Sequence, residues 1–275
     1  MTRSALAAFA VAFGLALAAS GAAPGPAEQA RFLEATRAAA LDYSDLLPDF
    51  VCTETMRRSV AEGADSRNLD TLTFQVTYAG KKESYKLVEG NRVSGRDFYS
   101  VGGATSAGEF GSLLRWIFEP ASSATFHWEK ASTNHKSPVW VYSYRVPRSG
   151  SRYVLAFDGG NGEKSILVGF HGQIEIAREN HRALRLTSVA DDIPPGFAIQ
   201  SSSTSIDYAF ADVGGKPFLL PSQAETDMLY QPRLSDSKET LRNTRAKLMR
   251  NFLEFRGYRK FAVDSDIDFG GDGKP

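Results

Sequence analysis

The residues of this chain that could do acid–base or metal chemistry do not stand at spacings typical of a catalytic or metal site. The four histidines are His127, His135, His171 and His181. None lies four residues from another, and no H-E-x-x-H motif is present. A site assembled by folding from distant residues, such as His171 and Asp207, would make the protein a secreted hydrolase, and this alternative stays open.

Three aspartates near the end of the chain, Asp264, Asp266 and Asp268, look at first like the start of a calcium-binding loop. An EF-hand loop needs glycine at its sixth position and glutamate at its twelfth. This chain has Phe269 and Pro275 at those positions. Alternate residues of a strand share one face, so we expect a solvated strand face and no metal site.

The single cysteine, Cys52, excludes an internal disulfide, and no base is recognisable as its partner. We expect it to be a small buried apolar residue. The chain has no G-x-S-x-G motif, no P-loop and no dinucleotide-binding glycine pattern. We therefore predict no catalytic residue and no cofactor, and the sequence favours a protein that is not an enzyme.

Aromatic side chains give a stronger indication of a binding site. Trp140, Tyr142 and Tyr144 share one face of a predicted strand, and other large side chains occupy comparable faces elsewhere. On the concave side of a curved sheet, such side chains form either a packed core or an apolar cavity, and the sequence leaves both open. We predict that a ligand groove is lined by Phe74, Val76, Trp128, Trp140, Tyr142, Tyr144 and Tyr208.

Two helices and many strands must position these residues. Apolar residues at three- and four-residue steps predict a helix over 27–47, which Pro48 ends. A capping-box spacing of Ser106 and Glu109 predicts a second helix, followed by apolar residues at helical spacing as far as Phe118.

Most of the remaining chain alternates between apolar and polar residues, which is typical of strands with one buried face. The alternation is clearest over 71–78 and 140–146, and it returns as far as 261–269. We predict a mainly β (α+β) fold: a curved antiparallel sheet of about ten strands, forming an open half-barrel with an N-terminal helix and one internal helix. One domain is expected over 24–269, with a disordered tail over 270–275.

The first residues have the layout of a secretory signal peptide, which we place at 1–23. A basic start at Arg3 precedes an apolar run over 5–19 and a stretch of small residues. The run is shorter than the roughly 20 residues of a membrane span, and no cysteine follows it to carry a lipid. We expect export to the periplasm, with an extracellular location as the alternative, and no membrane span after cleavage.

The charge is balanced, with 32 basic and 32 acidic residues, so nucleic acid is not expected as a partner. Segments 47–55, 108–114, 206–208 and 218–221 resemble exported bacterial proteins without assigned activity. The stretch 172–225 is similar to the second half of LolA/LolB/RseB-like envelope proteins. That resemblance implies an open antiparallel half-barrel with helices in its concave face and a lipidic or lipoprotein cargo; it places no cargo-binding residue in this sequence.

These observations predict a soluble periplasmic protein that binds a lipid, an acyl chain or a lipoprotein in an apolar groove. Two alternatives remain: an envelope structural or interaction module without a small ligand, and the hydrolase with a site outside known motifs.

Overall fold

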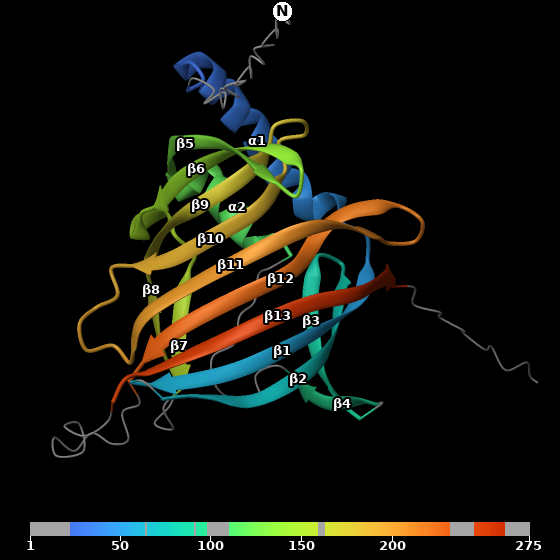
Figure 1. Cartoon of the computed structure of the whole chain (residues 1–275), viewed down its shortest axis with the longest axis vertical. Coiled ribbons are helices and arrows are strands. Elements are labelled where there is room, and N and C mark those ends of the chain that lie inside the picture. Colours follow the sequence, from blue (N-terminus) through green and yellow to red (C-terminus); the bar gives the residue numbers. More distant parts are fainter. Residues whose placement is uncertain are drawn as a thin grey trace, which may run out of the picture.

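The computed structural model describes residues 23–63, 65–90, 92–97, 110–158, 163–231 and 245–261. Within these residues, eleven strands form one antiparallel sheet in the order β4-β3-β2-β1-β13-β12-β11-β10-β9-β6-β5. The sheet curves strongly and stays open, with β4 and β5 at its two edges (Figure 1). The predicted fold class is confirmed. The predicted signal peptide, apart from Ala23, and the predicted tail lie outside the described residues.

The strands of the large sheet are β1 (Phe50–Glu62), β2 (Asp65–Ala79), β3 (Lys82–Glu89), β4 (Arg92–Asp97), β5 (Thr125–Asn134), β6 (Ser137–Val146), β9 (Gly169–Ala177), β10 (Ala183–Asp191), β11 (Ile199–Asp212), β12 (Pro217–Tyr230) and β13 (Lys247–Lys260). A separate pair consists of β7 (Val154–Asp158) and β8 (Glu163–Leu167). The helices are α1 (Pro26–Leu46) and α2 (Ser112–Phe118), and two 3-10 turns cover Pro120–Ser122 and Arg148–Gly150.

Strand alternation gives the sheet an apolar concave face and a charged convex face. On β1, for example, Met56 is fully buried while Arg57 points outward and pairs with Glu254 of β13, with 2.8 Å between nitrogen and oxygen. Similar cross-strand pairs join Arg185 to Asp207 and Arg250 to Asp227. The convex face is therefore the solvated one.

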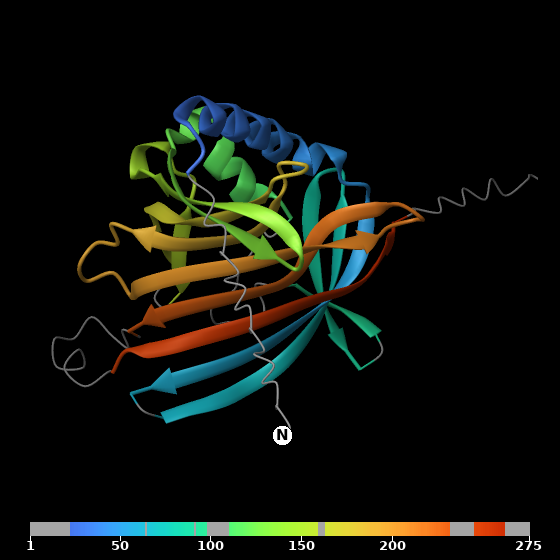
Figure 2. The ribbon, with the colours of Figure 1, turned by 45° about the horizontal axis from the view of Figure 1, so that its top comes forward.

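Both helices lie on the concave side (Figure 2). Helix α1 buries one stripe, in which Phe32 packs on Trp140 with 4.4 Å between ring centroids. At its other end, the Tyr43 hydroxyl donates to the backbone oxygen of Leu219 over 2.9 Å. The helix ends at Leu46, before Pro48, so the predicted helix is confirmed to within one residue.

Helix α2 buries the predicted apolar face: Leu113, Leu114, Ile117 and Phe118. It begins later than predicted, because Gly111 precedes it with a φ of 112°, which is outside the helical region. The predicted capping box, Ser106 with Glu109, lies outside the described residues.

The concave face carries two apolar clusters. The main core lies between the sheet and the two helices. A smaller one joins Leu155, Val168, Ile199 and Met228 beside the β7–β8 pair. Packing in the main core is tight at Gly172 of β9, where an added Cβ would lie 1.9 Å from the backbone oxygen of Thr187. Only glycine fits there.

Candidate binding site on the concave face

The predicted groove residues come together on the concave side, and six of the seven are buried in the main core. Phe74, Val76 and Tyr142 are fully buried, Tyr144, Tyr208 and Trp140 are at most 6% exposed, and Trp128 is half-buried. Helix α1 covers this region through Phe32 on Trp140 and Tyr43 on Tyr208. A ligand reaches Tyr142 and Tyr208 only if α1 moves, and the role of the seven residues in binding stays a prediction.

One of these residues also lines a surface hollow. Trp140 borders a space of about 260 Å³ at the start of α1, beneath the Arg178 guanidinium, whose carbon lies 5.3 Å from the ring centroid. The other lining residues are Glu28, Arg31, Phe32 and His181. This hollow is small and is lined by only one of the seven predicted residues, so it does not form the predicted groove.

Farther along the strands, six polar side chains form one row across the concave face. Each stands opposite the next in the strand register, from β2 through β1, β13, β12 and β11 to β10. We call this set the polar row: Asp70, Arg58, Asn251, Thr226, Thr204 and Ser188. Apolar residues of the main core, such as Leu253, lie on one side of it, and Val60, Met249 and Met228 lie on the other.

The Arg58–Asp70 ion pair lies at the β2 end of the polar row. The guanidinium donates to both carboxylate oxygens, over 2.7 and 2.6 Å. The Arg58 side chain is 9% exposed and that of Asp70 is 39% exposed. Because Asp70 accepts hydrogen bonds from Arg58, the pKa of its carboxyl lies below its ordinary value.

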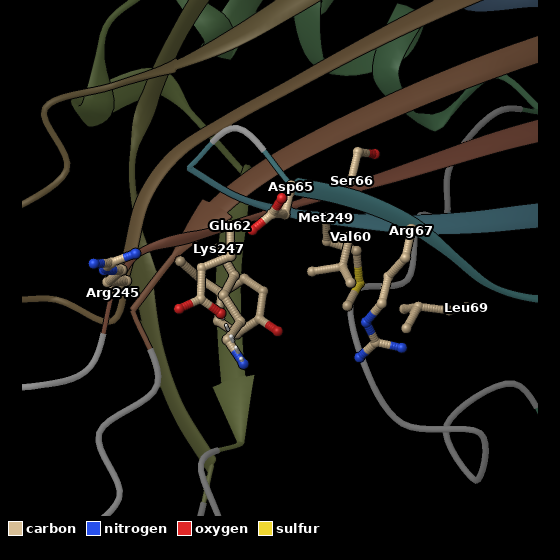
Figure 3. Close-up of a pocket in the computed structure, with 10 residues that line it drawn as sticks. Val60, Glu62, Asp65, Ser66, Arg67, Leu69, Arg245, Lys247 and Met249 are labelled. Atoms are coloured by element: carbon tan, nitrogen blue, oxygen red, sulfur yellow. Dashed lines mark ion pairs between the residues drawn. The ribbon is translucent and has the colours of Figure 1, made fainter.

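Another hollow lies beyond the polar row, at the open end of the concave face (Figure 3). Its volume is about 430 Å³. Its apolar floor consists of Val60, Leu69, Tyr230 and Met249. The rim is polar and consists of Glu62, Asp65, Ser66, Arg67, Arg245 and Lys247. We call this space the distal hollow.

A second hollow, of about 350 Å³, borders the Arg58–Asp70 pair on the side of β3 and β4. Its apolar lining comes from Leu72, Leu87 and Val88. Its remaining lining residues are polar or charged: Thr71, Thr73, Glu89 and Arg96. Open space therefore borders the buried arginine on the side of β3 and β4 as well.

Neither the polar row nor the distal hollow is among the features predicted from the sequence. A signal was present in β1, because Arg58 falls at the same period-two position as Met56 and Val60. A charged residue at an inward position of a strand indicates a buried ion pair or a binding site. Its partners on β13 and β12 could not be found in the same way, since they depend on strand pairing.

The structure does not bring the proposed hydrolase residues together. His171 lies on the convex face, where its Nδ1 is 2.7 Å from an oxygen of Asp191, and Asp207 accepts hydrogen bonds from Arg185. Cys52 is buried, and burial raises the pKa of its thiol to about 12. Within the described ranges, no three His, Cys, Asp or Glu side chains lie close enough to hold a metal. Asp264, Asp266 and Asp268 lie outside those ranges.

No protein-family model and no curated protein matches this chain. A solved LolA superfamily protein from Nitrosomonas europaea is 9% identical, with a TM-score of 0.36 over 85% of this chain and 94% of that chain. A DUF1329 family protein from Desulfovibrio piger is 8% identical, with a TM-score of 0.38 over 85% and 95%. A putative outer membrane lipoprotein-sorting protein domain from Vibrio parahaemolyticus is 12% identical, with a TM-score of 0.36 over 86% and 95%.

At these identities and TM-scores, the likenesses say nothing about what this chain binds. Neither helix in the described part of the chain combines the length and apolar character needed to cross a membrane.

Proposed function

We propose that this is an exported protein that binds a single apolar chain, such as the acyl chain of a lipid, in the distal hollow. The observation that carries the proposal is an open space of about 430 Å³ floored by Val60, Leu69, Tyr230 and Met249. This volume falls in the range of small-molecule sites, roughly 300–1,000 Å³. Each Å² of apolar surface that leaves water there contributes about 25 cal/mol.

The position of the helices supports this site over the region predicted from the sequence. Helix α1 crosses the sheet from β6, where Phe32 packs on Trp140, to the turn between β2 and β3, where Asp45 pairs with Lys81. The distal hollow lies at the other end of β1 and β2, next to Glu62 and Asp65. Side chains of α1 and α2 occupy the concave space around Tyr142 and Tyr208. The distal hollow has no helix residue among its lining.

The seven predicted groove residues form a second, separable part of the proposal. A bound chain contacts Tyr142 and Tyr208 only when α1 has moved off them, because Phe32 and Tyr43 now occupy that space. Binding in the predicted groove therefore requires α1 to move, whereas binding in the distal hollow does not.

Titration of the delipidated protein with a fluorescent fatty acid tests the proposal. We expect saturable binding that Leu69→Lys weakens about tenfold or more, because a charge then stands in the apolar floor. Thr53→Lys is the matched control, since Thr53 is exposed on the convex side of the same sheet and should bind like the wild type. Unfolding curves of both variants show whether the fold is intact.

Tyr208→Leu separates the two parts. Loss of affinity in this variant would support contact with the predicted groove, and unchanged affinity would confine binding to the distal hollow. An absence of saturable binding by the wild type would contradict the proposal and leave the interaction module as the better hypothesis.

A further inference from the structure

We infer that the ligand of the distal hollow is a phospholipid, and that one of the two rim arginines, Arg67 or Arg245, binds its phosphate. This inference rests on the proposed function, because it places a head group on the apolar chain. It starts from the distribution of charge around the hollow, where five charged side chains surround four floor residues.

The two arginines of the rim are the cations available to a ligand. Lys247 faces Glu62, with 3.8 Å between nitrogen and oxygen. Neither Arg67 nor Arg245 forms an ion pair with any other residue in the described part of the chain, and both are exposed. By contrast, Arg57, Arg185 and Arg250 of the convex face each pair with an acidic side chain.

The arginines stand on either side of the apolar floor. Figure 3 shows Arg245 and Arg67 toward opposite ends of the hollow, with Val60, Met249 and Lys247 between them. A chain lying on the floor therefore has a cationic group at its end whichever way it enters. Guanidinium groups bind phosphate oxygens through two parallel hydrogen bonds, which an ammonium cannot do.

The acidic residues of the rim limit how much negative charge a bound head group can carry. Glu62 and Asp65 offset two of the three cations, so the rim carries a net charge of +1. A rim of this kind accepts one phosphodiester, and it disfavours a head group with several negative charges. A zwitterionic head group fits best, because its ammonium can face the exposed carboxylate of Asp65 while its phosphate faces one of the arginines.

The test compares two ligands with the same acyl chain: a lysophosphatidylethanolamine and a monoacylglycerol, which lacks the phosphate. Each displaces the fluorescent fatty acid from the full-length mature protein. We expect the wild type to bind the phospholipid about tenfold more tightly, as one charge-assisted contact of about 1.4 kcal/mol gives. The preference should shrink at about 0.5 M salt, because the arginines are exposed.

The variants assign the preference to the two arginines. Arg67→Gln with Arg245→Gln should abolish the preference, because the affinity for the phospholipid then falls to that for the monoacylglycerol. Arg256→Gln is the control, since Arg256 is an exposed arginine of the convex face. It should keep the preference.

The outcomes are distinguishable from those of the proposed function. If neither ligand binds, the proposed function fails and the inference fails with it. If both bind equally, or if the double variant keeps the preference, the phosphate site is wrong while the chain site stands. Glycerophosphoethanolamine, the head group without a chain, should not displace the fluorescent fatty acid. Displacement as strong as that by the lipid would show that the hollow binds the anion and not the chain.

Discussion

At the residue scale, two buried tyrosines of β6 differ in one hydrogen bond. The hydroxyl of Tyr144 donates to the backbone oxygen of Thr187 over 2.7 Å. The hydroxyl of Tyr142 has no hydrogen-bond partner among the described residues, and burial raises its pKa to about 12. The same aromatic strand face thus contains one satisfied and one unsatisfied polar group.

Replacement of each tyrosine by phenylalanine tests this difference. Tyr144→Phe leaves the Thr187 oxygen unsatisfied and should lower the free energy of unfolding by about 2 kcal/mol. Tyr142→Phe removes an unsatisfied hydroxyl and should leave the free energy of unfolding unchanged or raise it by about 1 kcal/mol. Urea unfolding measures both, and equal losses would show that the Tyr142 hydroxyl has a partner.

The Arg58–Asp70 pair predicts a dependence of stability on pH. The pKa of Asp70 is lowered in the folded protein, chiefly by its hydrogen bonds with Arg58. The folded state therefore binds this proton less tightly than the unfolded chain does. The stabilisation is present above the ordinary carboxyl pKa of about 3.9, and it is lost as the pH falls through the lowered value.

Asp70→Asn should lower the free energy of unfolding by about 1 kcal/mol at neutral pH, a modest value because Asp70 is partly exposed. The difference from the wild type should vanish in acid. Asp45→Asn is the control, since both side chains of the Asp45–Lys81 ion pair are exposed. Its effect on the free energy of unfolding should be smaller than that of Asp70→Asn. A difference that stays constant down to about pH 2 would contradict the assignment.

At the element scale, α1 is held less firmly than the strands that it covers. It contacts the core through one stripe of buried residues, Phe32, Thr36, Ala40 and Tyr43. A central strand such as β1 bonds to a neighbour on each side, β2 and β13. Elements with few buried apolar contacts open at a lower free energy than the whole molecule.

Hydrogen exchange followed by mass spectrometry should therefore show α1 amides exchanging before those of β1 and β13. Phe32→Ala should speed exchange in α1, because it removes the contacts with Trp140 and Tyr142. Equal protection of α1 and β1 would show that the helix opens only with the whole molecule. It would also exclude entry of a ligand beneath α1.

At the scale of the whole molecule, Cys52 provides a probe of global unfolding. It is 3% exposed, it lies in the main core, and burial raises its pKa to about 12. At pH 8 only about one thiol in ten thousand would be ionised. A thiol reagent should therefore label the folded protein very slowly, and labelling should follow the unfolding curve in urea. Rapid labelling without denaturant would contradict the burial of this residue.

The sequence by itself determined the local features of the protein. Alternation such as that over 71–78 identified strands with one buried face, and three- and four-residue spacing identified both helices. These patterns depend on the geometry of a few consecutive residues, which repeats every two residues in a strand and every 3.6 in a helix. For the same reason, the sequence predicted the aromatic residues that share the concave face.

Only the tertiary structure decided which part of that face is filled and which is open. The polar row joins Arg58 to Asn251, residues 193 positions apart, through the pairing of β1 with β13. The distal hollow likewise combines the end of β1 with Tyr230 and Lys247. Such neighbours depend on the order and register of distant strands and on where the helices pack. No local spacing records these, and so the sequence predicted a concave aromatic face without showing that helices occupy it.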